Sequence, residues 1–180
     1  MAQLDVLCSG YIGRGVASTV SLVRAEGLVA VVDPGMVPSR STILDPMAEL
    51  GVSPAQVTDV IISHHHPDHT INIALFPEDV RIHDHWAIYQ RDVWTSRGAD
   101  GVELAPGVSL IETPGHTAQD ITTLVDADDG TAALTHLWWH EGHDHDPFAV
   151  DHDELERQRR RVSSMATLIV PGHGPPFRVG

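Results

Sequence analysis

The sequence predicts a single α/β domain, and two observations carry this prediction. Short apolar runs bounded by turn residues alternate along the chain with segments that have helical apolar spacing. The chain has 180 residues, of which 42% are hydrophobic and 20% charged, and this suits one compact domain but is short for two. We therefore expect residues 1–180 to form one domain of layered strands and helices.

Eight strands are expected, most of them short and rich in Val, Ile and Leu. In chain order they are residues 16–24, 28–32, 60–62, 80–83, 108–113, 121–125, 131–134 and 168–170. An Asp-rich turn separates the strands at 121–125 and 131–134, which predicts a hairpin. Several of the other runs are continuously apolar, as is typical of strands buried on both faces.

Three helices are expected, at residues 41–50, 86–94 and 151–164. Pro46 inside the first indicates a kink or a late start, and Ser53-Pro54 is typical of a further helix N-terminus. The helix at 151–164 begins with acidic residues and carries Arg157 to Arg161 toward its end. This order matches the helix macrodipole, which explains the arginines without nucleic acid.

The charge of the chain limits its partners. Formal net charge is −14, and all 11 basic residues are Arg. Such a surface repels phosphate backbones and anionic lipid, so we expect a small-molecule substrate and no membrane, with nucleic acid as the less favoured alternative. The first ten residues lack an export signal, and the single Cys8 suits a reducing compartment. These features favour a cytoplasmic protein.

Histidine is abundant, with 13 residues, and it recurs in the loops that follow predicted strands. The tract His64-His65-His66-Pro67-Asp68-His69 follows residues 60–62, His116 lies in Thr-Pro-Gly-His-Thr, and His173 lies in Pro-Gly-His-Gly. In an extended backbone His64 and His66 project to the same side, and a turn at Pro67 can bring Asp68 and His69 toward a neighbouring point. Imidazole and carboxylate ligands of this mix suit Zn, Fe, Mn or Co better than Ca or Mg.

These motifs resemble those of the metallo-β-lactamase fold superfamily. The resemblance covers about residues 16–175 and depends on Asp33 after an early strand, His64-x-His66-x-Asp68-His69, His116 and His173, in family order. The short length and the run from Asp68 to Pro77 are most similar to the small metallo-β-lactamase-domain-containing protein 1 group. The resemblance implies an αββα sandwich, two mixed sheets flanked by helices, with metal at one edge of both sheets.

The resemblance also implies a ligand set. It assigns His64, His66 and His116 to a first divalent ion and Asp68, His69 and His173 to a second. One or two ions are expected, with zinc favoured over iron or manganese and the first position tighter than the second. Asp33 is expected to hold the metal loop through hydrogen bonds rather than to bind metal itself.

Position 136 departs from the family pattern. The family usually has Gly-Asp after the strand that ends near residue 134, and this carboxylate bridges the two ions, whereas the chain has Thr135-His136. A neutral imidazole offers one lone pair, so we expect His136 to bind one metal directly. Tighter hydroxide binding or loss of the second ion would follow. Glu141, Asp144 and Asp146 are candidate replacement carboxylates.

The remaining histidines and tryptophans are expected to be mainly structural. His83 and His85 are interpreted in this way, with contact to a metal ligand as the alternative, and His152 as a structural or surface residue. The loop at 140–146 is expected to be exposed and polar, with a lid over the metals as the alternative. Trp138-Trp139 is expected to lie in the core, with a pocket wall as the alternative.

Together these features predict metal-dependent hydrolysis. A metal-bound hydroxide would attack a small ester, lactone, thioester, amide or phosphodiester, with Asp68 as the catalytic residue that orients it. Three alternatives stay open: a nuclease or phosphodiesterase, a mononuclear iron enzyme that oxidises a sulfur compound, and a metal-binding protein without turnover. A nuclease would have to work against the net charge of −14.

Overall fold

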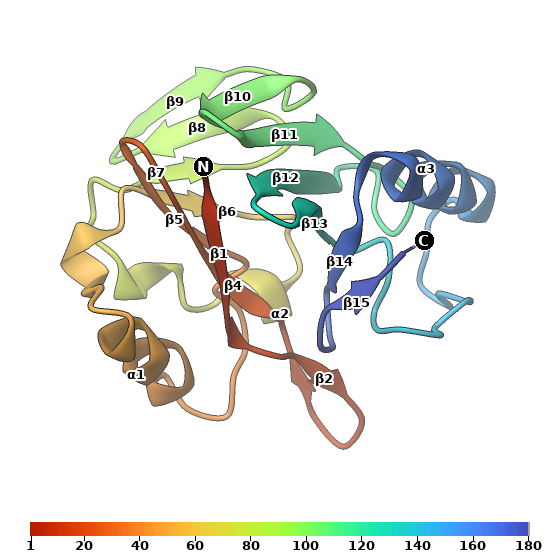
Figure 1. Ribbon diagram of the computed structural model, residues 1–180, viewed down its shortest axis with the longest axis horizontal. Coiled ribbons are helices and arrows are strands. Elements are labelled where there is room, and N and C mark those ends of the chain that lie inside the picture. Colours follow the sequence, from red (N-terminus) through yellow and green to blue (C-terminus); the bar gives the residue numbers. More distant parts are fainter. Residues whose placement is uncertain (180) are drawn as a thin grey trace.

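The computed structural model describes residues 1–179, which form two facing β-sheets with helices outside them (Figure 1). The first sheet has the order β1-β4-β5-β6-β7-β8-β9. Its strands are β1 (Gln3–Cys8), β4 (Val20–Ala25), β5 (Leu28–Val32), β6 (Asp59–Ile61), β7 (Arg81–His83), β8 (Ala87–Gln90) and β9 (Val93–Ser96). The second sheet has the order β10-β11-β12-β13-β14-β15. Its strands are β10 (Val102–Ala105), β11 (Val108–Glu112), β12 (Ile121–Ala127), β13 (Gly130–Thr135), β14 (Leu168–Pro171) and β15 (Phe177–Arg178).

The other elements are short. A hairpin of β2 (Tyr11–Ile12) and β3 (Val16–Ala17) projects beside the sheets (Figure 1). The helices are α1 (Ser41–Glu49), α2 (Pro67–Thr70) and α3 (His152–Met165), with 3₁₀ turns at Pro54–Gln56 and Ile73–Leu75. No helix within residues 1–179 is long and apolar enough to cross a membrane.

Alternation along the strands builds three apolar layers. In β5, Ala30 and Val32 point into the layer between the sheets, while Val31 packs with Ile43 and Met47 of α1. The strands of the second sheet alternate in the same way: Leu134 faces the first sheet, and its neighbour Ala133 packs with Leu155 of α3. The expected αββα sandwich is therefore confirmed.

The sheet topology brings several strand ends to one edge. β5 is parallel to β6, β13 is parallel to β14, and β11 runs with β13 because both are antiparallel to β12. Backbone hydrogen bonds from Ile121 N to Ser63 O (2.9 Å) and from Thr19 N to Gly172 O (2.7 Å) join loops of the two sheets at this edge. The loops that carry the histidine motifs all start here.

Two predictions of secondary structure are wrong. Residues 86–94, expected as a helix, form part of the β8–β9 hairpin, in which Tyr89 faces Trp94 and Arg91 has a φ of 56°. Pairing of β8 with β7 decides this segment, whose apolar spacing is too short to distinguish helix from strand. Ser53-Pro54 begins a single 3₁₀ turn rather than a helix.

Other elements differ in their boundaries. The expected strand at 16–24 is divided into β3 and β4, and neither β1 nor β10 was expected. α1 starts at Ser41 with Pro46 inside it, so the late start is wrong. The expected hairpin at 121–134 and the helix near 151–164 both occur, as β12–β13 and α3.

Candidate metal centre

Histidines from four segments of the chain, which follow β6, β11, β13 and β14, converge at the shared sheet edge. The ring of His136, which follows β13, is central: its centroid lies 4.4 Å from that of His64, 4.2 Å from His116, 4.8 Å from His69 and 5.0 Å from His173. The ring of His66 lies 4.5 Å from His64 and 5.0 Å from His116. All six histidines predicted as ligands are thus brought together.

Three of these residues, His64, His66 and His116, form what we call the first group. Nδ1 of His66 lies 2.8 Å from Nε2 of His64 and 3.1 Å from Nε2 of His116. Four ligands around a tetrahedral ion with bonds of 2.0 to 2.1 Å lie about 3.4 Å from one another, close to these separations. The first group therefore presents three nitrogens to one point.

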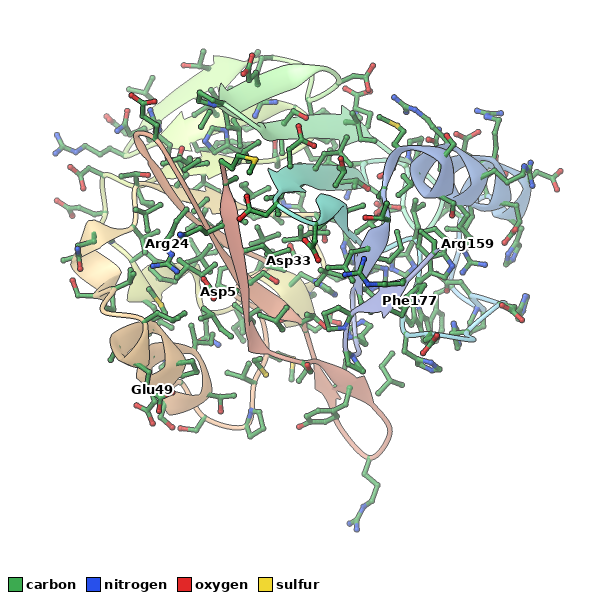
Figure 2. The ribbon with its side chains drawn as sticks, viewed as in Figure 1. Asp5, Arg24, Asp33, Glu49, Arg159 and Phe177 are labelled. Atoms are coloured by element: carbon green, nitrogen blue, oxygen red, sulfur yellow. The ribbon has the colours of Figure 1, made fainter. Side chains whose placement is uncertain are left out.

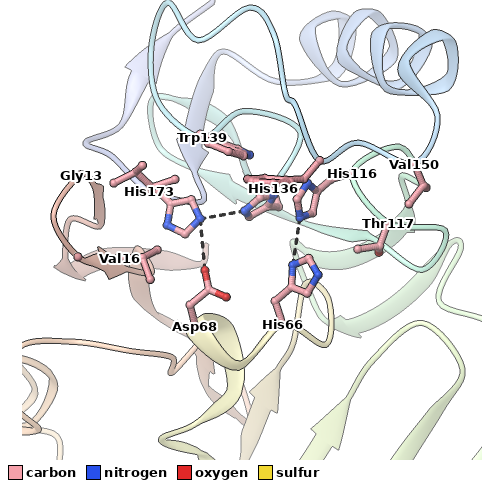
Figure 3. A pocket seen from close by; sticks show the side chains of 13 residues that line it. Gly13, Val16, His66, Asp68, His116, Thr117, His136, Trp139, Val150 and His173 are labelled. Carbon is pink, nitrogen blue, oxygen red and sulfur yellow. Dashed lines mark hydrogen bonds and ion pairs between the residues drawn. The ribbon is translucent and has the colours of Figure 1, made fainter.

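The second group contains His69, His136, His173 and Asp68. Ligand atoms of the three histidines lie within 4.8 Å of one another, and Nε2 of His136 is 3.0 Å from Nε2 of His173. Oδ2 of Asp68 lies 3.6 Å from Nε2 of His69. It also lies 3.6 Å from Nε2 of His173, the contact drawn in Figure 3. His136 also lies within 4.8 Å of ligand atoms of His64 and His116, so it stands between the two groups.

Asp33 orients one histidine of each group through the ring nitrogen that faces away from the centre. Its Oδ2 accepts a hydrogen bond from Nδ1 of His69 (2.9 Å) and another from Oγ of Ser63 (2.6 Å). Oγ of Ser63 in turn accepts from Nδ1 of His64 (3.0 Å). Figure 2 shows Asp33 near the middle of the molecule. These bonds turn Nε2 of both histidines toward the centre, and Asp33 itself contributes no inward atom.

Asp146 plays the corresponding part for His116, and the sequence did not single out this role. Its Oδ2 accepts from Nδ1 of His116 (2.6 Å) and from the indole Nε1 of Trp139 (3.2 Å). The prediction that Asp146 replaces the bridging carboxylate is therefore wrong, because Asp146 bonds Nδ1 of the candidate ligand His116, the nitrogen that faces away from the centre. Glu141 and Asp144, the other candidates, are exposed.

Arg159 of α3 fixes the loop that carries Asp146. Its Nε donates to the carbonyl of Leu137 (2.8 Å) and its Nη1 to the carbonyl of Asp144 (2.8 Å), and it is buried (Figure 2). Arg157 pairs with Glu154, and Arg161 donates to the carbonyl of Glu112 (2.9 Å). These three arginines are thus engaged within the chain. None of them lies in the last turn of α3, so the macrodipole interpretation is wrong for them, and their side-chain contacts explain them instead.

The residues fit a bound cation. Nδ1 of His64 and Nδ1 of His116 donate outward, so both Nε2 atoms carry lone pairs that face the same nitrogen of His66. One Nδ1–H of His66 can satisfy only one of them. In the second group, Nε2 of His69 is buried without any hydrogen-bond partner. A divalent ion would satisfy these lone pairs, and the nitrogen-rich donor set suits zinc or iron.

Burial also keeps these imidazoles neutral. Burial, reinforced by neighbouring imidazoles, holds the pKa of His64 and of His136 well below the ordinary value of 6.5. The same two causes lower the pKa of His173 to about 4, against the opposing effect of the Ala17 carbonyl that accepts from its Nδ1. Neutral imidazole is the form that binds metal, so at pH 7 the lone pairs of these residues are available.

Gly172 makes room for His136. A Cβ at position 172 would lie 2.4 Å from Cδ2 and 2.9 Å from Nε2 of the His136 ring, closer than such atoms approach. The glycine before His173 therefore allows the ring of His136 to reach His173. The Pro-Gly-His-Gly turn therefore supplies one candidate ligand, His173, and the space for a second, His136.

A pocket of about 560 Å³ opens onto the two groups (Figure 3). Its polar lining includes His66, Asp68, His116, His136 and His173. Its apolar lining includes Ile12 and Val16 of the β2–β3 hairpin and Trp139, Phe148 and Val150 of the loop before α3. No Arg is among the described residues that line it. Trp139 is thus a pocket wall, the alternative that the sequence left open, whereas Trp138 packs against Arg159.

The other histidines near the tract lie elsewhere. Nε2 of His65 bonds Asp84 (2.8 Å), away from both groups. His83 is buried, and its Nε2 bonds Oδ1 of Asp59 (2.7 Å). The segment from His140 to His145 is largely exposed, although His143 stacks on Trp139 at a centroid distance of 4.5 Å.

Comparison with known proteins agrees with this architecture. "Metallo-beta-lactamase domain-containing protein 1" of Xenopus laevis is 35% identical over 170 residues, covering 89% of this chain and 72% of that protein. The human protein of the same name is 34% identical over 177 residues, covering 93% of this chain. The chain spans only 65% of the human protein's length.

Solved structures show the same fold. A protein from Thermotoga maritima, solved as a candidate metallo-beta-lactamase, superposes with a TM-score of 0.77 at 22% identity, covering 98% of this chain and 99% of that one. TTHA1623, solved in a di-iron-bound form, has a TM-score of 0.70 at 19% identity, covering 96% and 95%. The metallo-beta-lactamase superfamily profile matches residues 13–175. The chain therefore belongs to the metallo-β-lactamase superfamily.

Proposed function

We propose that this protein is a metal-dependent hydrolase of a small substrate whose scissile group is an ester, lactone, thioester, amide or phosphodiester. The observation that carries the proposal is the opening of an apolar pocket directly onto the two groups of candidate ligands. Zinc is the ion we propose. When bound, a divalent ion supplies activation of water and polarisation of the scissile oxygen.

The side chains of the pocket have separate parts in this proposal. Asp68 lines the pocket with a half-buried carboxylate, and in this proposal it orients an attacking water and accepts its proton. Asp33 and Asp146 fix the direction of the imidazoles that they contact. Ile12 and Phe148 exclude water from one side of the substrate and provide an apolar surface for it.

The charge distribution favours a small substrate over a nucleic acid. The net charge of −14 repels a polyanion, and the described pocket lining offers no Arg to contact phosphates. The arginines of α3 at positions 157, 159 and 161 are engaged with groups of the chain itself. We therefore propose a substrate that presents at most one negative charge.

Metal analysis combined with a hydrolysis screen tests the proposal. Protein purified without oxygen would be assayed for Zn, Fe and Mn and then incubated with p-nitrophenyl esters, lactones, thioesters and bis(p-nitrophenyl) phosphate. We expect chelator-sensitive hydrolysis of at least one class and its loss in Asp68→Asn. Cleavage of RNA or DNA alone would favour a nuclease. One iron per chain with oxygen uptake on a thiol substrate would favour the sulfur oxygenase, and no turnover would leave a binding protein.

A further inference from the structure

His65 lies between two candidate ligands, His64 and His66, but its side chain is bonded elsewhere. Its Nε2 donates to Oδ2 of Asp84 (2.8 Å), and its ring lies against that of Trp86 at a centroid distance of 5.4 Å. The side chain of His65 is 40% exposed, whereas that of Asp84 is only 1% exposed. Because hydrogen bonds to an ionised carboxylate are stronger than those between neutral groups, this contact fixes His65 although solvent reaches its ring.

The carboxylate of Asp84 is itself held rigidly. Its Oδ1 accepts hydrogen bonds from the backbone N–H groups of Trp86 (2.8 Å) and Ala87 (2.8 Å). Its Oδ2 accepts one from the hydroxyl of Tyr89 (2.7 Å) in addition to the one from His65. A buried carboxylate with donors on both oxygens cannot rotate without losing a hydrogen bond, and that loss is costly. Asp84 is therefore a fixed point just after β7.

The strand order explains why Asp84 meets the histidine tract. β6 and β7 are parallel neighbours, with Ile61 opposite His83, and the N–H of Ile62 donates to the carbonyl of His83 (2.9 Å). The carboxyl ends of parallel neighbours lie at the same edge of a sheet, so the residues that follow these two strands lie side by side. The first residue after β7 can thus bond the middle histidine of the tract after β6.

His66 differs from the other two residues of the first group. His64 and His116 are each oriented by a hydrogen bond from Nδ1 to a neighbouring side chain. In His66, Nδ1 faces the Nε2 atoms of those two residues, and Nε2 has no hydrogen-bond partner within residues 1–179. The side chain is also exposed. Apart from the other candidate ligands, no side chain in the described part of the protein orients the ring of His66.

The backbone must therefore place His66, and the chain is held on both sides of it. On the C-terminal side, the carbonyl of His66 accepts hydrogen bonds from N of His69 (3.0 Å) and Oγ1 of Thr70 (3.2 Å), which belong to α2. On the N-terminal side, the neighbouring residue is His65 with its bond to Asp84. Loss of that bond would free the peptide group before His66, and the ring would move with it.

We propose that Asp84, through His65, positions His66 to bind metal in the first group. This inference rests on the proposed function for metal binding alone and not for hydrolysis. Asp33 and Asp146 orient other ligands through hydrogen bonds that lead to the rings, whereas Asp84 acts through the backbone. Loss of supporting bonds to a ligand lowers metal affinity about 10–100-fold, and we expect the lower end here because the ring is reached indirectly.

Competition for Co²⁺ between the protein and a chromophoric chelator tests this inference, because it measures metal binding without any substrate. His66→Ala identifies the dissociation constant that belongs to the first group. His65→Phe keeps a ring against Trp86 but loses the bond to Asp84, and it should raise that constant about tenfold. His65→Gln keeps an N–H group that can reach the carboxylate, so its constant should lie within about threefold of the wild-type value.

Tyr89→Phe is the matched control. It removes the other side-chain donor to Oδ2 of Asp84, but Tyr89 lies in β8 and has no link to the histidine tract except through that carboxylate. The urea midpoint of unfolding should fall in both Tyr89→Phe and His65→Phe, since each leaves the buried carboxylate with one hydrogen bond fewer. Only His65→Phe should weaken metal binding, a result that a purely structural role of Asp84 does not explain.

A double variant tests whether Asp84 acts through His65. Asp84→Asn should also raise the dissociation constant of the first group. Asp84→Asn combined with His65→Phe should bind metal no more weakly than the weaker of the two single variants, because both changes remove the same contact. Circular dichroism would establish that each variant is folded, and the two variants at position 65 keep the test decisive if Asp84→Asn does not fold.

Any of four results would overturn the inference: no binding of Co²⁺, an unchanged constant in His65→Phe, equal weakening in Tyr89→Phe and His65→Phe, or no recovery in His65→Gln. Additive effects in the double variant would equally exclude a path through His65. Turnover is a separate measurement. A protein that shows the expected pattern of metal affinity and hydrolyses nothing would retain this inference and overturn the proposed function. A hydrolase whose metal affinity is unchanged in His65→Phe would do the opposite.

Discussion

Two buried histidines, His69 and His83, show how the same residue type serves a metal centre and a structural network. Both ring nitrogens of His83 have partners within the chain, since Nε2 bonds Asp59 (2.7 Å) and Nδ1 accepts a hydrogen bond from Arg97 (3.1 Å). His69 donates from Nδ1 to Asp33 (2.9 Å), but its buried Nε2 has no partner. Since burial of an unpaired polar atom is costly, the second arrangement points to a missing ligand and the first does not.

The largest expected effect distinguishes these two histidines directly. His69→Ala should remove about one metal ion per chain and reduce hydrolysis by at least about a hundredfold, because a side chain that binds the metal directly is lost. His83→Ala should keep the full metal content and instead lower the free energy of unfolding by about 1–3 kcal/mol, since buried Asp59 loses a partner. Metal analysis and urea denaturation measure both. Loss of metal in His83→Ala would break the comparison.

The next effect concerns the carboxylates behind the ligands. Asp33→Asn should weaken metal binding by both groups, because Asp33 contacts His69 directly and reaches His64 through Ser63. Asp146→Asn should weaken only the first group, through His116. A decrease of about 10–100-fold in affinity is expected for each affected group. Competition with a metal indicator measures it, and equal effects of both variants on both ions would contradict the assignment.

The candidate metal centre and the network around Asp59 should also differ in how their contributions to stability depend on pH. In metal-free protein the pKa of His173 is lowered to about 4 by burial, so between pH 6.5 and 4 the unfolded chain binds a proton that the folded chain does not. Stability should therefore fall as pH decreases through this window, by about 1.4 kcal/mol per pH unit for each such proton. Bound metal should suppress the loss.

The Asp59 network should respond only at lower pH. Burial raises the pKa of the Asp59 carboxyl, but hydrogen bonds from His83 and Arg81 outweigh burial and lower the pKa to about 2. Its contribution to stability is therefore complete above the ordinary value of 3.8 and is lost as pH falls from there toward 2. Denaturation curves of wild type and Asp59→Asn should differ least at the acid end. A constant difference from pH 7 to pH 2.5 would contradict this.

The smallest effects are expected at the pocket wall. Phe148 is 70% exposed, so Phe148→Ala should raise KM for substrates with an apolar arm only severalfold and leave kcat unchanged. Trp139→Phe keeps an apolar ring but removes the donor to Asp146, and it should also loosen the first metal position slightly. Kinetics with short and long acyl esters, beside a metal titration, separate the two. A larger effect of Phe148→Ala on metal affinity than on KM would contradict this division.

The sequence by itself determined the layered architecture and the set of candidate ligands. Apolar runs such as residues 28–32 and 60–62 have the length and composition of buried strands, and His64, His116 and His173 each follow a strand. These are local properties, since a ligand placed just after a strand lies at a sheet edge wherever that strand is in the sheet. The departure at His136 could also be seen, because it depends on a residue type and not on a contact.

Only the tertiary structure decided which carboxylates bond the outward nitrogens of the candidate ligands, and therefore the direction of each imidazole. Asp146 is 30 positions from His116, and the bond between them depends on how Arg159 draws the loop against α3. Tyr89 and Trp94 likewise became strand partners only because β7 offers β8 a free edge. Such choices depend on what packs beside a segment, and the sequence of the segment does not contain that information.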